Sequence, residues 1–194
     1  MKYLSVYNSD SDILKVISDI HLRGEWFDLD CTYSRGVFWK GIRQPKYKSD
    51  LTPLFDDVIQ NDSRELKAFG DNTMNSVVFD PPFLFRNRKA VNNDQMCARF
   101  SYFKSYDDLL DMYSSSMKSI YRVLKKGGLL AFKCQDMSDN RFYCTHNDII
   151  NMAQEIGFKL KDIVIKVSNN KLQRDAKQQN VVAKTHCYWL VFKK

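Results

Sequence analysis

The residues with the clearest chemical potential are Asp80, Pro81, Pro82 and Phe83, which directly follow the apolar run at residues 74–79. Two consecutive prolines fix the backbone, so the Asp80 carboxylate and the Pro81 carbonyl would point in set directions. An exocyclic amino group on adenine or cytosine is a weak nucleophile, because its lone pair is delocalised into the ring. Two acceptors that bond its N–H groups would favour a pyramidal nitrogen with its lone pair aimed at an electrophile. The four residues are therefore candidate catalytic residues for chemistry on such an amino group.

Phe83 completes this interpretation, because its ring can stack on a base. Stacking would hold the base about 3–3.5 Å from the group to be transferred, so that much of the rate comes from positioning. Asp80 would stabilise the positive charge that develops on the nitrogen, and no strong general base is needed. The alternative is a rigid turn after a strand, without catalysis.

The surrounding pattern predicts the elements that position this motif. Strands are expected at 25–30, at a short segment ending near Asp50, and at 74–79, 129–134, 159–167 and 187–193; helices are expected at 11–22, 52–60, 106–124 and 146–156. Strands that alternate with helices predict a parallel α/β sheet, and two final strands without a helix between them predict one antiparallel insertion. In such sheets ligands bind outside the carboxyl ends of the strands, where Asp80 would lie.

Asp80–Phe83 resembles motif IV of the amino-methyltransferases, (Asp/Asn/Ser)-Pro-Pro-(Tyr/Phe/Trp). With DCTYSRGVFWK, RVLKKGGLLAFKCQD, THNDIINMAQEIGF and the ending HCYWLVFKK, the chain is similar to small DNA amino-methyltransferases of bacteriophages and mobile elements. The likeness runs from about Ser5 to the end. It implies a Rossmann-like class I methyltransferase fold with an antiparallel C-terminal hairpin, one catalytic domain over residues 1–194, S-adenosyl-L-methionine as cofactor, and little room for a domain that recognises the target sequence.

The resemblance also assigns cofactor-binding residues upstream of the motif. The segment at residues 27–39 is similar to a divergent motif I, with a single glycine where the family usually has two or three. Asp50, twenty residues after Asp30, would accept bonds from ribose hydroxyls, and the segment at Asp62 resembles the acidic site beside the adenine ring. The predicted cofactor-binding set is Asp30, Thr32, Tyr33, Ser34, Gly36, Asp50, Asp62 and Ser63.

The charge of the chain predicts a polyanionic partner. Its formal net charge is +7, and its sequence pI is near 9.1. The positive charge is concentrated after the motif, at residues 84–104, and in the connection at residues 169–184. Excess positive charge favours nucleic acid, because binding to phosphates releases counterions. The candidate nucleic-acid-binding residues are Arg86, Arg88, Lys89, Arg99, Lys171, Arg174 and Lys177; solvated basic loops are the alternative.

Polar residues after the expected strand at residues 129–134 are candidates for a base pocket. Lys133, Gln135 and Asp136 would lie at the same sheet edge as Asp80, although ordinary loop polar groups explain them equally well. His146 begins an expected helix and is interpreted as a residue of the cap region rather than a catalyst. The five cysteines lack a closely spaced pair, so no metal site and no disulfide framework is expected.

The N-terminal residues lack the apolar core of a signal peptide, and no apolar run reaches the roughly 20 residues of a membrane span. We therefore expect a cytoplasmic protein of a bacterial or phage-infected cell, with no membrane partner. A homodimer or a second specificity subunit is a further expectation, since few residues remain for target recognition.

Several functions are consistent with these residues. Asp in the first motif position favours adenine N6 in DNA; cytosine N4 in DNA and adenine N6 in RNA are the alternatives. A catalytically inactive subunit that only binds nucleic acid would explain the glycine-poor loop. A nicotinamide-dependent enzyme is disfavoured, because no G-x-G-x-x-G follows any strand.

Overall fold

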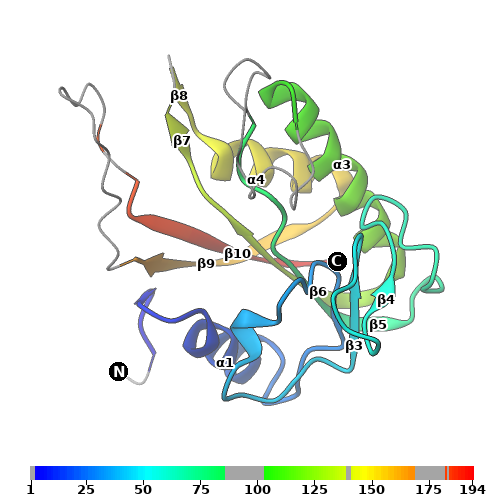
Figure 1. Cartoon of the computed structure of the whole chain (residues 1–194). Helices are drawn as coiled ribbons and strands as arrows, with labels where there is room; N and C mark the ends of the chain where they lie inside the picture. The colour runs from blue at the N-terminus through cyan, green and yellow to red at the C-terminus, as the bar shows by residue number, and fades with distance from the viewer. Residues whose placement is uncertain (1–2, 86–102, 139–140, 169–181, 183) are drawn as a thin grey trace.

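The computed structural model describes residues 3–85, 103–138, 141–168, 182 and 184–194. Its centre is an eight-stranded sheet with the order β1-β9-β10-β6-β5-β2-β3-β4 (Figure 1). The strands are β1 (Val6–Tyr7), β2 (Leu29–Asp30), β3 (Tyr47–Asp50), β4 (Ile59–Gln60), β5 (Met74–Phe79), β6 (Leu124–Cys134), β9 (Lys159–Val167) and β10 (His186–Lys193). A separate two-stranded hairpin pairs β7 (Met137–Ser138) with β8 (Phe142–Tyr143).

The direction of the strands follows the sequence prediction. The neighbouring strands from β4 to β6 in the sheet order are parallel to one another, and β1 is parallel to β9. β10 is antiparallel to both β6 and β9 and lies between them. The expectation of a mostly parallel sheet with an antiparallel C-terminal pair is therefore confirmed.

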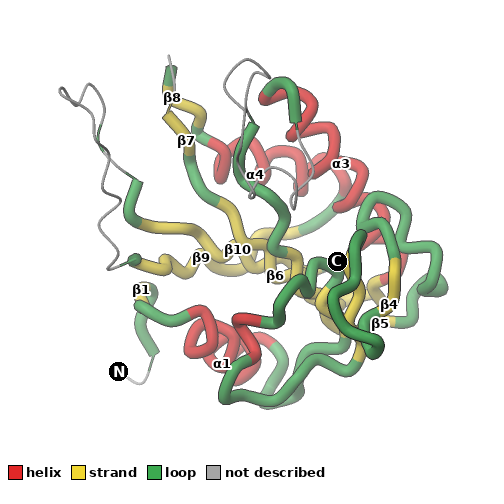
Figure 2. The backbone as a smooth tube through the Cα atoms, viewed as in Figure 1, coloured by secondary structure: helices red, strands yellow, loops and turns green. Residues whose placement is uncertain are grey.

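Helices cover both faces of the sheet, as Figure 2 shows. α1 (Asp10–His21) lies on one face, whereas α3 (Tyr106–Val123) and α4 (Thr145–Ile156) lie on the other. The Ser105 side chain caps α3 by accepting a hydrogen bond from the Asp108 N–H, and Gly157 ends α4 in the left-handed conformation. Among the described residues, no helix combines the length and apolar character needed to cross a membrane.

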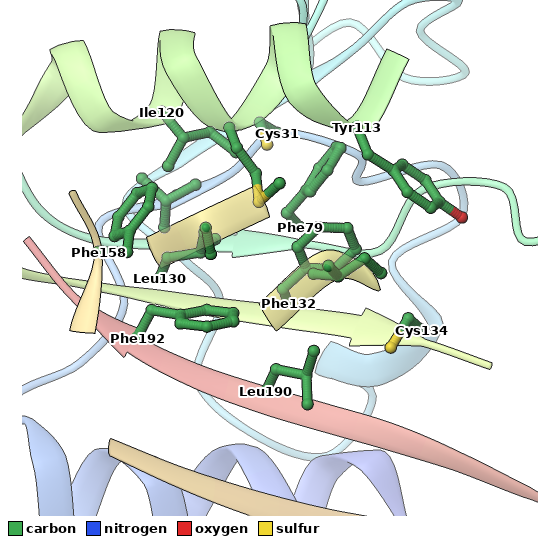
Figure 3. Close-up of a cluster of buried hydrophobic side chains, with 14 of the residues drawn as sticks. Cys31, Phe79, Tyr113, Ile120, Leu130, Phe132, Cys134, Phe158, Leu190 and Phe192 are labelled. Carbon is green, nitrogen blue, oxygen red and sulfur yellow. The ribbon is translucent and has the colours of Figure 1, made fainter. Parts of the chain in front are cut away.

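Each face has its own hydrophobic core. Under α3 and α4, buried side chains of the helices meet those of β5, β6 and β10, including Tyr113, Phe79 and Phe132 (Figure 3). Under α1, the core is built around Trp39 and Trp189, which are 1% and 0% exposed. Both cores pack against β5 and β6, so the ends of these strands are firmly placed.

Three sequence predictions about elements were wrong in part. The helix expected at residues 52–60 is absent: this segment forms turns and then β4, and of its side chains only Val58 is buried. Without an apolar face, no packing compensates the cost of helix nucleation. The strand expected at 25–30 is reduced to β2, and the helix expected at 11–22 begins one residue earlier, at Asp10, with Ser9 as its cap. β1 and the β7–β8 hairpin were not predicted.

Candidate active site

The site lies where the chain direction across the sheet reverses. β2 and β5 are parallel neighbours, with Asp30 in register with Val78. From this pair the chain proceeds through β3 on one side and β6 on the other. A crevice opens outside the carboxyl ends of strands at such a switch point, and ligands of open α/β sheets bind there. Asp30 ends β2 and Asp80 follows β5, so both predicted carboxylates reach this point.

Hydrogen bonds join the two segments that leave these strands. The Cys31 N–H donates to the Val78 carbonyl at 3.2 Å, which extends the pairing of β2 with β5. Beyond it, the Asp80 N–H donates to the Thr32 hydroxyl oxygen at 2.7 Å. The loop after β2 and the motif after β5 therefore form one connected unit.

A cavity of about 870 Å³ lies beside this unit. Its size falls in the range of pockets for small molecules and cofactors. Its lining includes every residue predicted to bind the cofactor, together with the first three residues of the motif: Asp30, Thr32, Tyr33, Ser34, Gly36, Asp50, Asp62, Ser63, Asp80, Pro81 and Pro82.

Asp30 is the most deeply buried carboxylate of the cavity, at 2% exposure. One of its oxygens accepts a hydrogen bond from the indole N–H of Trp39 at 2.7 Å, and the other accepts one from the Thr32 N–H at 2.9 Å. Burial disfavours the charged form more than these two bonds favour it. The pKa of Asp30 is consequently raised from 3.8 to about 7.

The glycine-poor loop keeps its shape through a few specific contacts. Gly36 has a φ of +60°, and a Cβ there would lie 2.5 Å from the ring of Tyr33. Ser34 also has a positive φ, of +49°, and its N–H donates to the Asp50 carboxylate at 2.8 Å. Asp50 thus stabilises a conformation that a glycine would otherwise supply, so one glycine is enough in this loop.

Asp50 and Asp62 also line the cavity, and they have different hydrogen-bond partners. Asp50 ends β3, and its second oxygen accepts from the Thr52 N–H at 2.9 Å. Asp62 follows β4 and forms an ion pair with Arg64, which holds the pKa of Asp62 below its usual range. A carboxylate offers about four lone-pair sites, so Asp50, which accepts two bonds, retains acceptor capacity, whereas both oxygens of Asp62 are occupied by N–H groups of Arg64.

The Asp80 carboxylate has an oxygen that accepts no hydrogen bond from the described residues. Its Oδ1 atom is buried, and no hydrogen-bond donor among the described residues reaches it. The Lys133 ammonium is 3.9 Å from that atom. Burial raises the pKa of Asp80 from 3.8 to about 6, against the lowering effect of Lys133. The following turn is held by Tyr113, whose hydroxyl donates to the Pro82 carbonyl at 2.7 Å.

Other predicted residues lie apart from the cavity lining. Phe83 stands beside Lys133, whose ammonium is 6.0 Å from the ring centre. The Gln135 side chain donates to the His186 carbonyl at 2.8 Å, and Asp136 is 5% exposed. All seven candidate nucleic-acid-binding residues lie outside the described residues: Arg86, Arg88, Lys89, Arg99, Lys171, Arg174 and Lys177.

The structure also brings Asp136, Cys144 and His146 together, although no sequence pattern indicated a metal site. One ligand atom from each lies within 4.8 Å of the others. Asp136 is already engaged, however, because its Oδ1 atom lies 2.8 Å from His146 Nδ1 and accepts the His146 N–H at 3.1 Å. Tyr188 donates to its other oxygen at 3.3 Å. This cluster satisfies itself, and Asp136 helps to fix the first turn of α4 by accepting the His146 N–H.

Sequence reasoning missed several cavity residues. Trp39 is the most consequential, because it donates to Asp30. Met112 adds apolar surface to the lining. No spacing rule marks these residues, although the aromatic cluster at residues 38–39 was a usable signal. Asp10 was also missed, and its contacts reach the site through Lys133.

A model of the DNA methylase family, which groups N6 and N4 methyltransferases, matches residues 74–194. The chain belongs to the N6/N4 DNA methylase family. This match confirms the resemblance predicted from the sequence, to S-adenosylmethionine-dependent methyltransferases of DNA amino groups. The family's matched segment begins with β5 and includes the Asp80 motif.

Solved structures agree on the fold. A protein from Thermus thermophilus, described as a DNA modification methylase and complexed with S-adenosyl-L-methionine, is 21% identical over 69% of this chain and 53% of its own, with a TM-score of 0.50. The cytosine-N4-specific PvuII DNA methyltransferase is 20% identical over 69% of this chain and 47% of its own, with a TM-score of 0.51. An S-adenosylmethionine-dependent methyltransferase from Archaeoglobus fulgidus is 14% identical over 95% and 94%, with a TM-score of 0.51.

These similarities confirm the Rossmann-like class I methyltransferase fold of this N6/N4 DNA methylase family member. The chain spans about half the length of the solved DNA methylases that it matches. No curated protein matches it.

Proposed function

We propose that this chain transfers a methyl group from S-adenosyl-L-methionine to the exocyclic amino group of a base in DNA, with adenine N6 as the preferred target. One observation carries the proposal: Asp80, whose carboxylate has a buried oxygen without a hydrogen-bond donor among the described residues, lines a cavity that also holds the predicted cofactor residues. A buried acceptor left without a donor is costly, so a ligand that donates there is favoured.

The residues of the cavity fit the cofactor. S-adenosyl-L-methionine supplies an electrophilic methyl group on a positively charged sulfur. The loop at residues 32–36 would hold its methionine part, Asp50 its ribose hydroxyls, and Asp62 with Ser63 its adenine ring. The buried Asp30 adds negative potential beneath this loop when it is ionised.

Asp80 and the Pro81 carbonyl would hold the target amino group. When both accept its N–H bonds, the nitrogen lone pair is directed at the methyl carbon. The new N–C bond forms as the C–S bond breaks, the sulfur keeps that electron pair, and the methylated nitrogen releases one proton to water. Asp80 stabilises the cationic nitrogen during this step, and Phe83 would stack on the base. In a duplex, the base must first leave the helix, at a cost of a few kcal/mol.

Adenine N6 in DNA is the preferred target among three alternatives. Asp in the first motif position favours adenine N6, while cytosine N4 in DNA, or adenine N6 in RNA, would use the same acceptors. Target recognition would fall to the basic segments, to a second copy or to a specificity subunit. The reaction would take place in the cytoplasm of a bacterial or phage-infected cell.

Transfer of tritium from methyl-labelled cofactor to DNA and to RNA tests this proposal. Digestion and chromatography of the modified nucleosides would then identify the product. We expect N6-methyladenine in DNA from the unaltered chain and none from Asp80→Ala. Label only in N4-methylcytosine or only in RNA would replace the proposed target by one of the alternatives. Absence of label together with absence of cofactor binding would favour an inactive binding subunit.

A further inference from the structure

A buried network of charge connects Asp80 to the N-terminal helix. The Lys133 ammonium is 3.9 Å from Asp80 Oδ1 but only 3.2 Å from Asp10 Oδ1 on α1. Asp10 also pairs with Lys166 at 3.0 Å and accepts the indole N–H of Trp189 at 2.9 Å. The side chains of Lys133 and Asp10 are only 8% and 12% exposed, so water screens their charges weakly.

The sheet explains why these groups meet. Lys133 on β6 is directly opposite Trp189 on β10, and Lys166 on β9 is directly opposite Cys187, two residues before Trp189 on the same strand. Opposed residues, and residues two apart on one strand, share a face of the sheet. Lys133, Trp189 and Lys166 therefore point to the face covered by α1, whose first residue is Asp10.

Aromatic rings restrict the Lys133 ammonium further. It lies 4.3 Å from the ring centre of Phe38, 5.8 Å from that of Trp189 and 6.0 Å from that of Phe83. Such contacts favour a cation with little access to water. Asp80 and Asp10 raise the pKa of Lys133 above its ordinary value, although burial acts in the opposite direction. Lys133 is therefore a fixed positive charge beside the motif.

We infer that Asp10 is a positioning residue that restrains Lys133 from bonding directly to Asp80, so that Lys133 supplies charge while the Asp80 carboxylate stays available to the target amino group. The inference rests on the proposed function, because it assigns that carboxylate to the target. A separation of 3.9 Å is too long for a hydrogen bond yet short enough for strong attraction. A shift of about 1 Å would close it, and the bond to Asp10 opposes that shift.

The groups that face Asp80 make the inference testable by titration. Lys133 and Lys166 lower the pKa of Asp80, whereas burial and Asp10 raise it. Removal of Lys133 should raise this pKa further. Removal of Asp10 should lower it, both because a negative charge is lost and because Lys133 can then approach. Among the described residues, other titratable groups near Asp80 are Asp30 on β2, Tyr113 on α3, Cys134 on β6 and Cys187 on β10.

The experiment follows the Asp80 carboxyl carbon by NMR in protein labelled with carbon-13 aspartate, with Asp80→Asn to assign the signal. We expect Asp10→Asn to lower the pKa of Asp80 and Lys133→Met to raise it, each by roughly one pH unit. Asp12→Asn is the matched control, because Asp12 lies on the same helix but is exposed and pairs with Lys15. If Asp10 and Lys133 had purely structural roles, their variants would shift the pKa of Asp80 in the same direction or would leave it unchanged. Either result would overturn the inference.

Two further measurements keep the result interpretable. If Lys133→Met fails to fold by circular dichroism, the direction of the shift in Asp10→Asn decides alone, and an unchanged or raised pKa refutes the restraint. In methyl transfer, Asp10→Asn should lose at least about tenfold in kcat while cofactor affinity is retained, because Lys133 then occupies Asp80 Oδ1. Since the titration needs neither cofactor nor nucleic acid, a failure of the proposed function in the unaltered chain remains distinguishable from a failure of this inference.

Discussion

The hydroxyl oxygen of Thr32 accepts a hydrogen bond from the backbone N–H of Asp80 at 2.7 Å. Thr32 lies in the loop predicted to hold the cofactor, and Asp80 opens the motif predicted to hold the target amino group. The same threonine donates its backbone N–H to Asp30 at 2.9 Å. One residue therefore sets the position of Asp80 relative to the loop. Methyl transfer requires the cofactor and the target amino group to be held in a defined position relative to each other.

Replacement of Thr32 tests this connection. Thr32→Val keeps the shape of the side chain but removes the acceptor, which leaves the Asp80 N–H without its partner. We expect kcat to fall by roughly tenfold to a hundredfold, the equivalent of about 1–3 kcal/mol for an unsatisfied buried group. Thr32→Ser retains the hydroxyl and should keep most of the activity. Equal losses in both variants, measured by single-turnover transfer, would show that the hydroxyl bond is unimportant.

A substitution at Asp80 separates catalysis from cofactor binding. Asp80→Asn removes the negative charge and one acceptor while it keeps the size of the side chain. We expect the rate of methyl transfer to fall by about 10²–10³-fold, as for other groups that stabilise charge in a transition state. The dissociation constant of S-adenosyl-L-methionine, measured by calorimetry, should change little. Comparable weakening of cofactor binding would instead place Asp80 in the cofactor site.

The pH dependence of the rate should report the ionisation of Asp80. Its pKa is raised to about 6, and only the ionised carboxylate accepts bonds through both oxygens. The rate should therefore be constant above about pH 7 and fall about tenfold per pH unit below about pH 6. The residual rate of Asp80→Asn should lack this limb. A limb that persists in the variant would assign the titration to another group, of which Asp30 is the nearest candidate.

Much of the site could be predicted because its signals are local in the sequence. Met74–Phe79 is an uninterrupted strand that two prolines follow closely, and the structure reproduces its bounds. Asp30 and Asp50 each end a strand of the parallel sheet, so their convergence follows from topology alone. The acidic residues predicted to meet the cofactor all line one cavity for that reason.

Contacts between distant segments could not be predicted in the same way. Asp10, near the N-terminus, contacts Lys133 on β6 only once the sheet is assembled, and the contact of Trp39 with Asp30 depends on how the loop between them folds. Local patterns also failed at residues 52–60, where a helix was expected. The Asp50 carboxylate accepts the Thr52 N–H instead, so the capping chemistry serves a turn. Side chains able to cap a helix are equally able to stabilise a turn.

The buried Asp30 should make stability depend on pH. Its pKa is raised from 3.8 to about 7, so the folded chain binds this proton more tightly than the unfolded chain. The contribution of this proton to the free energy of unfolding is complete below about pH 4 and is lost as the pH rises through about 7. Relative to the unaltered chain, Asp30→Asn should therefore gain stability between about pH 4 and pH 8, by on the order of 4 kcal/mol. Urea unfolding at both pH values measures this difference, and a gain no larger than that of the exposed Asp12→Asn would contradict it.

Gly36 and Gly41 have similar backbone conformations, so their alanine variants show whether the cofactor loop requires glycine for steric reasons. Gly36 and Gly41 have φ values of +60° and +74°, so alanine carries a similar conformational penalty of about 1 kcal/mol at both positions. A Cβ at Gly41 would meet nothing within 4 Å, whereas a Cβ at Gly36 would lie 2.5 Å from the ring of Tyr33. That ring is anchored, because the Tyr33 hydroxyl donates to Gln44 at 2.6 Å.

Gly36→Ala should therefore push the Tyr33 ring aside and distort the loop, while Gly41→Ala should not. We expect the affinity for S-adenosyl-L-methionine to fall at least about tenfold in Gly36→Ala and by less than about twofold in Gly41→Ala, with thermal unfolding measured on both. The double variant Gly36→Ala, Tyr33→Ala removes the obstacle and distinguishes a clash from simple backbone strain. If the clash dominates, the double variant binds the cofactor no more weakly than Tyr33→Ala. If it binds much more weakly, backbone strain at Gly36, rather than contact with Tyr33, requires the single glycine of this loop.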